Sequence, residues 1–370
     1  MWPYFIEKFG NASSLNHAYG HEAAEAVAAS RGQVARLISA VPEAIVFTSG
    51  ATEANNLAIK GVLRAGPRGG HLITTAAEHR AVLDPAKRLK RSGFEVTVLP
   101  VDRTGQVDPG QVASAIQSTT RLVSVMAANN EVGTLSRVAE IGAICRRRGV
   151  LFHCDATQAV GRIPVDVTAW NVDLLSLSAH KFYGPKGVGA LFVRQGEPRV
   201  RLEPLFDGGG HEQRLRSGTL AVPLIVGLGT ASALAAAELP VESGRIQDLR
   251  DRLWSGLSGR IVGLIRNGDS AYCLPGNLHV SVPDLDGDVL LNALTEIAVS
   301  SGSACTTAEP EPSHVLRAMG LNDRLARSSL RFGLGRMTTE EEIDFAIEYT
   351  SNTIDRLRRT GTSGNRGGQG

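Results

Sequence analysis

Short apolar or β-branched runs alternate with longer segments of helical period between residues 45 and 193. This alternation is typical of a parallel α/β sheet. Between the runs, segments 80–91 and 138–148 have the length of crossover helices, and residues 21–39 form an earlier amphipathic helix. Seven runs are expected to be strands: 45–48, 71–75, 95–99, 122–127, 150–154, 173–178 and 190–193.

The order of elements changes to an α+β pattern after about residue 240. Strands are expected at 261–266, 278–282, 297–300 and 329–332. Thr338 and Glu341 have the spacing of a capping box at the start of the last helix. We therefore expect a large domain over 10–240, a smaller domain over 241–360 on which residues 1–20 can pack, and a flexible Gly-rich tail over 361–370.

The charge and hydropathy of the sequence argue against two classes of binding partner, nucleic acids and membranes. The 370 residues carry 39 Lys+Arg against 37 Asp+Glu, a net charge of +2, with no long cationic block. A nucleic-acid partner is therefore not expected. The chain shows neither an uninterrupted apolar run of the roughly 18 residues that span a membrane nor a signal-peptide pattern. These observations predict a cytoplasmic protein that binds no membrane.

Polar residues follow five of the predicted strands. In an open parallel sheet, ligands bind outside the carboxyl ends of the strands, so these residues are expected to form one site. They are Ser49-Gly50-Ala51-Thr52, Glu78-His79, Asn129-Asn130-Glu131, Asp155-Ala156-Thr157-Gln158 and Ser178-Ala179-His180-Lys181. A glycine turn before a helix can hold a phosphate, although a simple capped turn has the same pattern.

Three of these side chains suggest a carbonyl cofactor. Lys181 lies between an apolar strand and a Gly/Pro turn, where partial burial would let it form a Schiff base, although a strand-end lysine is more often a solvated charge. Asp155 is either an N-cap or the partner of a pyridine nitrogen. His79 is either a helix-start residue or a ring that stacks on the cofactor and carries protons. Metal binding by His79 is less favoured because no second histidine has a suitable spacing.

Four cysteines occur, at positions 145, 154, 273 and 305. Cys145, Cys154 and Cys273 fit core packing. Cys305 follows small polar residues, Ser301-Gly302-Ser303-Ala304, and precedes a Glu/Pro segment. We therefore expect an exposed, mobile and nucleophilic thiol at Cys305.

These motifs together resemble the cysteine desulfurases of the class V aminotransferase family, of the NifS/IscS type. The resemblance runs from Phe9 to about Arg336. Besides the strand-end motifs it covers Gly208-Gly209-Gly210-His211-Glu212, Arg216-Ser217-Gly218-Thr219, Ser301 to Cys305 and Ser328-Ser329-Leu330-Arg331-Phe332.

The resemblance implies pyridoxal 5′-phosphate (PLP) as cofactor, the fold-type I architecture and a homodimer. Lys181 would bind the cofactor covalently, His79 would stack on its ring, Asp155 would pair with the pyridine nitrogen and Gln158 would bond the ring hydroxyl. The substrate carboxylate would be bound by Asn130 and Arg331. The phosphate would be held by Ala51, Thr52, Ser178 and His180, with Thr219 supplied by the partner subunit.

The implied reaction converts L-cysteine to L-alanine. Lys181 would remove the Cα proton, and the Cys305 thiolate would take the substrate sulfur as a persulfide. The sulfur would pass to an acceptor protein such as an iron–sulfur scaffold, or to tRNA thiolation, and Cys305 could also ligate an iron–sulfur cluster transiently. Family members usually begin with an extra strand that lines the pocket and end in a scaffold-docking extension. The sequence therefore leaves two alternatives, an inactive or partner-dependent homologue and a related PLP lyase or aminotransferase.

Overall fold

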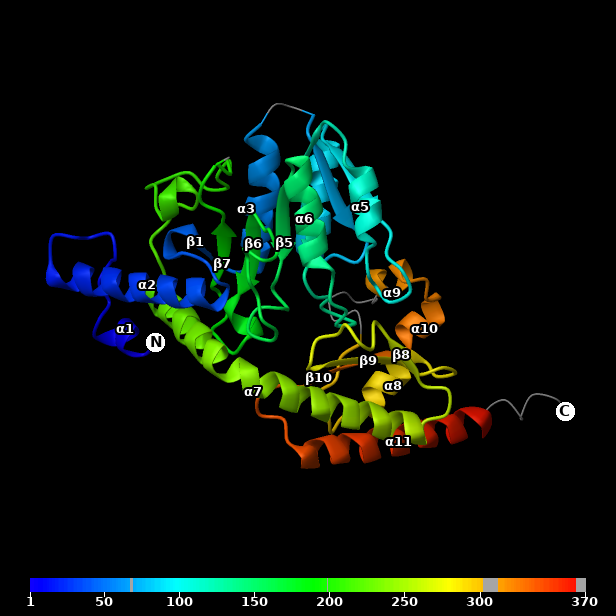
Figure 1. Ribbon diagram of the computed structural model, residues 1–370. Helices are drawn as coiled ribbons and strands as arrows, with labels where there is room; N and C mark the ends of the chain where they lie inside the picture. Colours follow the sequence, from blue (N-terminus) through cyan, green and yellow to red (C-terminus); the bar gives the residue numbers. More distant parts are fainter. Residues whose placement is uncertain (67–68, 198, 302–311, 364–370) are drawn as a thin grey trace. The chain divides into compact units, whose positions relative to one another are not determined.

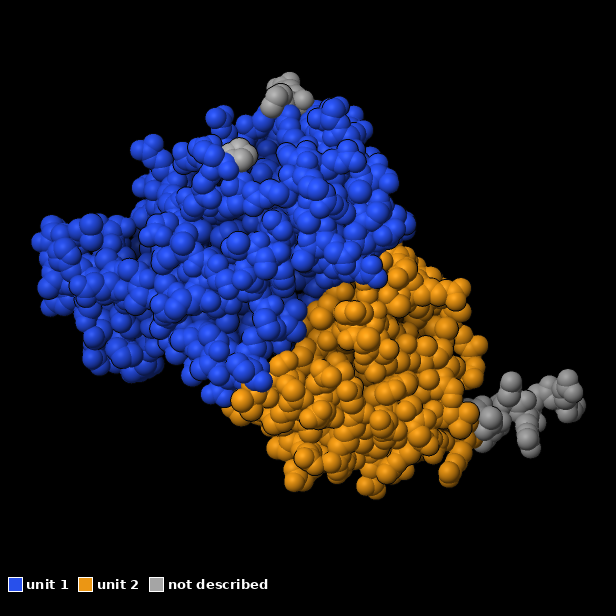
Figure 2. Space-filling model, viewed as in Figure 1, with its two compact units in different colours: residues 1–100, 107–128, 136–240 blue, residues 101–106, 129–135, 241–370 orange. Residues whose placement is uncertain are grey.

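The computed structural model describes residues 1–66, 69–197, 199–301 and 312–363 of the chain. It divides into two compact units (Figure 2). Unit 1 comprises Met1–Pro100, Val107–Ala128 and Ser136–Pro240, and unit 2 comprises Val101–Gln106, Asn129–Leu135 and Val241–Gly370. Residues 1–20 thus belong to unit 1, and two short segments from early in the chain belong to unit 2.

Unit 1 is built on a sheet of seven strands in the order β1-β7-β6-β5-β4-β2-β3 (Figure 1). Strands β2 to β6 run parallel to one another, and β7 is antiparallel to both β1 and β6. The predicted α/β fold class is confirmed, with every predicted strand of this sheet within two residues of its observed bounds. The strands are β1 Ile45–Thr48, β2 His71–Thr75, β3 Glu95–Leu99, β4 Thr120–Met126, β5 Leu151–Asp155, β6 Leu174–Ser178 and β7 Gly189–Val193.

The helices of unit 1 connect and cover these strands. Two predicted crossover helices have the expected bounds, α4 at Arg80–Arg91 and α6 at Val138–Arg148. The predicted amphipathic helix is α2, Ala18–Leu37. The others are α1 Pro3–Ile6, α3 Ala51–Arg64 and α5 Pro109–Ala115, and α7, Val222–Arg260, begins in unit 1 and ends in unit 2.

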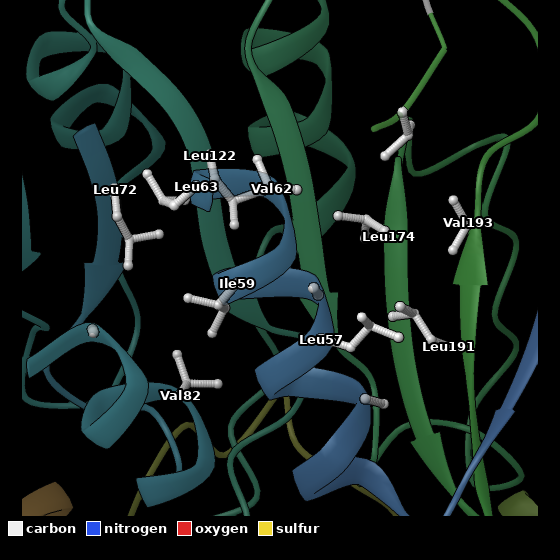
Figure 3. Packing of buried hydrophobic residues seen from close by; sticks show 14 of the residues in the cluster. Leu57, Ile59, Val62, Leu63, Leu72, Val82, Leu122, Leu174, Leu191 and Val193 are labelled. Atoms are coloured by element: carbon white, nitrogen blue, oxygen red, sulfur yellow. The ribbon is translucent and has the colours of Figure 1, made fainter. Parts of the chain in front are cut away.

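One hydrophobic cluster of unit 1 lies between α3, α4 and the sheet (Figure 3). The α3 side chains on this face recur at helical spacing, and the strands they meet are buried on both faces, as parallel strands usually are. Each fully buried leucine contributes about 1.5–3 kcal/mol relative to an exposed one. This packing fixes where α3 begins, at the carboxyl end of β1. The cluster includes Leu57, Ile59, Val62 and Leu63 of α3, Val82 of α4, and Leu72, Leu122, Leu174 and Leu191 of the sheet.

Unit 2 contains a three-stranded antiparallel sheet in the order β10-β9-β8. The prediction of a strand at 297–300 is wrong, because only Ser300 forms a bridge, to Arg331. The run is apolar because Ile297 and Val299 pack against the core of unit 2. The elements are β8 Ile265–Asn267, β9 Asn277–Ser281, β10 Ser329–Gly333, α8 Gly287–Ala293, α9 His314–Ala318, α10 Asp323–Arg327 and α11 Glu340–Ser363.

The start of α11 lies one residue later than predicted. The capping box pairs Thr339 with Glu342: Glu342 N donates to Thr339 Oγ1 at 3.2 Å, and Thr339 N donates to Glu342 Oε2 at 3.0 Å. The hydroxyl of Thr338 instead accepts from Gly335 N at 3.0 Å. Two threonine–glutamate pairs share the same spacing, so the preceding turn decides which of them caps the helix. Residues 364–370 of the predicted tail lie outside the described residues.

The amino-terminal part of α7 is long and apolar enough to span a membrane by length and composition, with a window of mean hydropathy 1.6. Its sequence is not an uninterrupted apolar run, because Thr230 and Ser232 lie within it. The buried positions of this part include Ile225, Leu228 and Ala235, and 39% of the window is buried. Buried core helices of soluble proteins can have the same length and apolar composition, so these two properties of α7 do not establish a membrane span.

Candidate functional site

Asp155 is the last residue of β5, and its buried carboxylate is held by two donors. Asn55 Nδ2 of α3 donates to Oδ2 at 2.7 Å, and Thr157 N donates to Oδ1 at 3.0 Å. Among the described residues, the buried Asn55 Oδ1 and Thr157 Oγ1 have no hydrogen-bond partner. Buried polar atoms are nearly always paired, so these two indicate that a polar ligand completes this end of the sheet. Gln158 follows in the same turn and is half-buried.

The start of α3 has the properties of an anion site. Its N-cap is Gly50, with φ 150° and ψ 178°, and a glycine has no side chain that could cap the first amides, those of Ala51 and Thr52. A Cβ on Gly50 would lie 3.6 Å from Ser178 Oγ, so that hydroxyl lies close to this turn. Ser178 Oγ is in turn 2.9 Å from His180 Nδ1. Free amides at a helix start, with a hydroxyl and an imidazole beside them, suit a phosphate.

Lys181 ends a short 3₁₀ helix, η2, at Ala179–Lys181, which directly follows β6. The side chain is half-buried, and Arg162 Nη2 donates to the Lys181 carbonyl at 3.1 Å. Partial burial lowers the pKa of the neighbouring His180, and the positive charges of Lys181 and Lys186 lower it further. The segment is therefore a cationic turn at the carboxyl edge of the sheet.

His79 is the N-cap of α4, where its Nδ1 accepts from Ala81 N at 3.1 Å. The helix-start interpretation is therefore correct for Nδ1, while the ring itself is exposed. Before it, Glu78 is fully buried, and its Oε1 accepts from Met126 N and from Thr75 Oγ1, both at 2.9 Å. Burial, helped by the charge of the nearby Asp155, raises the pKa of Glu78 to about 8 against the opposing effect of the two hydrogen bonds.

Unit 2 brings the two predicted substrate-binding residues together. Arg331 Nη1, from β10, donates to the Asn130 carbonyl at 2.7 Å. The backbone of Arg331 also pairs with Ser300, so the guanidinium has a fixed base. In the part of the chain that the structure describes, Asn130 Oδ1 is buried without a hydrogen-bond partner. Next to it, Glu131 accepts a hydrogen bond from Ser313 Oγ.

Comparison with known proteins identifies the family. Residues 1–345 match the Aminotransferase class-V family. The cysteine desulfurase IscS of Anaeromyxobacter dehalogenans (strain 2CP-C) is 54% identical over 359 residues, which cover 97% of this chain and 89% of that protein. The IscS of Shewanella sp. (strain MR-4) is 52% identical over 351 residues, covering 95% and 86%. The chain belongs to the cysteine desulfurases of the class V aminotransferase family.

Solved structures agree with this family. A NifS-like protein matches with a TM-score of 0.89 and 38% identity, covering 96% of this chain and 94% of that one. A structure of SspA in complex with cysteine matches with a TM-score of 0.80 and 36% identity, covering 91% and 94%. The family to which this desulfurase belongs is PLP-dependent, and its fold-type I architecture is the one observed here.

The structure describes only some of the remaining predicted residues, which are Thr219 and the four cysteines. Thr219 is exposed at the end of the segment 208–219. Cys305 lies outside the described residues. Cys145, Cys154 and Cys273 are buried, as predicted for core packing, and burial raises the pKa of all three thiols, to about 12 for Cys145. Among the described residues, no cluster of His, Cys, Asp and Glu is suited to hold a metal.

Asn55 was not predicted as a functional residue, and Glu78 was expected at the strand-end site without a specific role. The signal for Asn55 was an asparagine on the otherwise apolar face of a helix, next to Ala54, Leu57 and Ala58. For Glu78 it was a carboxylate three residues after the end of a predicted strand. Neither signal indicates the distant partners, Asp155 for Asn55 and Met126 N for Glu78.

Proposed function

We propose that this chain binds PLP and converts L-cysteine to L-alanine, with the sulfur transferred to Cys305 as a persulfide. The proposal rests on one observation: a carboxylate and a candidate phosphate site both lie at the carboxyl edge of the unit 1 sheet. There, Asp155 is oriented by Asn55, while the uncapped start of α3 lies beside Ser178. A carboxylate for a pyridine nitrogen and a cradle for a phosphate are the two recognition elements that PLP requires.

The residues present fit this cofactor. Asp155 would pair with the pyridine nitrogen, Gln158 would bond the ring hydroxyl, His79 would stack on the ring, and Lys181 would bind the carbonyl carbon. When bound, PLP supplies an electron sink for the negative charge that develops at the substrate Cα. The unpaired Asn55 Oδ1 and Thr157 Oγ1 support a polar occupant at this position. The phosphate would be held by Ala51, Thr52, Ser178 and His180, together with Thr219 of the second subunit of a homodimer.

Each reacting side chain has a defined task in this proposal. The planar guanidinium of Arg331 binds the substrate carboxylate in a bidentate manner, with Asn130 beside it. The amine of Lys181 takes the Cα proton. The Cys305 thiolate attacks the substrate sulfur, so an S–S bond forms and the C–S bond breaks. The electron pair of the C–S bond stays on carbon, which is protonated to give alanine.

The persulfide on Cys305 must reach an acceptor. We infer a cytoplasmic enzyme that delivers sulfur to a protein such as an iron–sulfur scaffold, with Cys305 as a candidate transient ligand of a cluster. The name IscS of the relatives and the absence of a cationic surface run in the sequence support a protein acceptor over a nucleic acid.

The test is L-alanine formation from L-cysteine by the purified protein with PLP and a reducing thiol. Lys181→Ala and Cys305→Ala should each abolish alanine formation, whereas Lys186→Ala, at the exposed lysine of the same turn, should retain most of it. Cys305→Ala should still change the PLP absorption spectrum when cysteine is added. Alanine formation that survives Cys305→Ala would show that the nucleophile is another residue.

A further inference from the structure

Glu53 places a carboxylate in the first turn of α3, next to the turn that we assign to the phosphate of the cofactor. Both of its oxygens are engaged. Ser49 N donates to Oε2 at 2.8 Å, and Arg216 Nε donates to Oε1 at 3.0 Å. The pair is largely shielded, with 9% of the Glu53 side chain and 24% of the Arg216 side chain exposed. Glu53 therefore ties Ser49, immediately before Gly50, to the segment 208–219.

The carboxylate of Glu53 has two opposite effects on an anion site. By accepting from Ser49 N it holds the turn in which Gly50 adopts φ 150° and ψ 178°, a conformation that is essentially restricted to glycine. Its negative charge, however, repels a phosphate bound at the same helix start. Charges that are shielded from water interact more strongly than exposed ones, so this repulsion would be costly unless a cation cancels it.

Arg216 is held in position by the segment that carries it. Glu212, four residues earlier, accepts from Arg31 Nη1 and Nη2 at 2.8 and 2.6 Å and from Phe47 N at 2.7 Å. Glu212, Gln213 and Arg214 have φ values of 48°, 58° and 66°, in the left-handed region that non-glycine residues rarely adopt. Such a turn persists only where the surrounding contacts hold it. The Arg31–Glu212 pair thus anchors the segment to α2 and β1, and Arg216 meets Glu53 from a fixed base.

We propose that Arg216 is a charge-compensating positioning residue for the phosphate of the cofactor. It neutralises Glu53, so that this carboxylate can shape the Ser49–Gly50 turn without repelling the phosphate. The inference rests on the proposed PLP function and deepens it. It explains how a helix that carries Glu53 in its first turn can still bind the doubly charged phosphate at its start.

The test compares PLP with pyridoxal, which lacks the phosphate, by absorbance titration of the full-length protein. Arg216→Gln should weaken PLP binding by about tenfold or more, because an uncompensated carboxylate then faces the phosphate, and should change pyridoxal binding by less than about twofold. The double variant Glu53→Gln/Arg216→Gln should recover PLP affinity to within about threefold of the parent protein. If Arg216 only stabilised the fold, the double variant would not recover its affinity for PLP.

Arg194→Gln is the matched control in the same unit. Arg194 Nε donates to Asp173 Oδ1 at 2.6 Å, and Phe152 N donates to Asp173 Oδ2 at 2.8 Å, so this carboxylate has the same two kinds of partner. Asp173 lies before β6, at the opposite end from Ser178, about 16 Å away at the usual rise per strand residue. The control should lower thermal stability without changing the ratio of PLP to pyridoxal affinity.

Three outcomes are decisive. Equal losses of PLP and pyridoxal affinity in Arg216→Gln, or no recovery in the double variant, would overturn the inference while leaving the proposed function intact. If the parent protein bound pyridoxal as tightly as PLP, the phosphate site itself would be wrong. Recovery in the double variant, with an unchanged ratio in Arg194→Gln, would support the compensating role.

Discussion

Asn55 and Asp155, 100 residues apart in the sequence, are joined by a hydrogen bond of 2.7 Å from Nδ2 to Oδ2. Both side chains are buried, with 1% and 5% of their surface exposed. The bond links the helix whose start is the candidate phosphate site to the carboxylate assigned to the pyridine nitrogen. The groups that we propose for the two ends of the cofactor therefore belong to one packed core.

Asn55→Leu should lower the free energy of unfolding by about 1–3 kcal/mol, because it leaves Oδ2 of the buried Asp155 carboxylate without its donor. It should also weaken PLP binding, since Asp155 would lose the contact that orients it. The measurements are urea unfolding and absorbance titration with PLP. Asn56→Ala, in which the lost bond is to the helix carbonyl of Thr52, is the control, and we expect a change within about 0.5 kcal/mol. Equal effects of the two substitutions would contradict the role of Asn55.

Gly189→Ala should disturb the candidate phosphate turn directly. A Cβ on Gly189 would lie 2.5 Å from the Leu177 carbonyl oxygen and 2.7 Å from Gly50 Cα, closer than real Cβ atoms approach backbone. Overpacking of this kind costs about 1–3 kcal/mol. We expect lower thermal stability and weaker binding of PLP than of pyridoxal relative to the parent protein. The control is Gly93→Ala, at a φ of 87° and with no heavy atom within 4 Å of its Cβ, which should lower stability through backbone strain without affecting the PLP to pyridoxal ratio.

Glu78→Gln should flatten the fall in stability with rising pH. Burial raises the pKa of Glu78 to about 8, above its ordinary value of 4.5, so the folded protein holds a proton that the unfolded chain releases. Its contribution to stability is full below pH 4.5 and is lost as the pH rises through about 8. The glutamine keeps an oxygen acceptor for Met126 N and Thr75 Oγ1. Unfolding free energies measured between pH 6.5 and 8.5 should therefore decline less in the variant, and identical slopes would contradict a protonated Glu78.

His153→Gln should flatten the fall in stability with decreasing pH. His153 is fully buried between Ser124 Oγ, 2.8 Å from Nδ1, and Ser176 Oγ, 3.0 Å from Nε2. Burial lowers its pKa to about 4, although Asp155 raises it in part. The neutral ring thus contributes stability that is present above pH 6.5 and is lost as the pH falls through about 4. Stability measured from pH 6.5 to 4 should fall less steeply in the variant.

His279 provides an independent test of why stability is lost at acid pH. It is buried in unit 2, where burial lowers its pKa to about 3 and the charge of Arg331 lowers it further. His279→Gln should remove a separate part of the same slope, so the two substitutions should add in the double variant. A parent-like slope in both single variants would mean that other groups govern acid unfolding.

The sequence by itself determined the strands of unit 1, the helices α2, α4 and α6, and the kind of chemistry at the strand ends. Apolar runs of four to seven residues followed by polar groups mark buried strands that end at a site, and this period is a local property that no distant contact changes. Lys181, Asp155 and the Ser49–Gly50 turn were therefore recognisable before any fold was known. The motifs together also identified the family.

The tertiary structure alone decided how these parts are paired. The antiparallel direction of β7, the reduction of 297–300 to a single bridge and the choice of Thr339 over Thr338 depend on neighbours that the local pattern does not specify. The partners of Asp155 and Glu53, Asn55 and Arg216, lie 100 and 163 residues away. Burial, which sets the pKa values of Glu78 and His153, is likewise a property of the assembled core. Sequence periodicity indicates which face of an element is apolar, but only the packed tertiary structure determines which residues that face contacts.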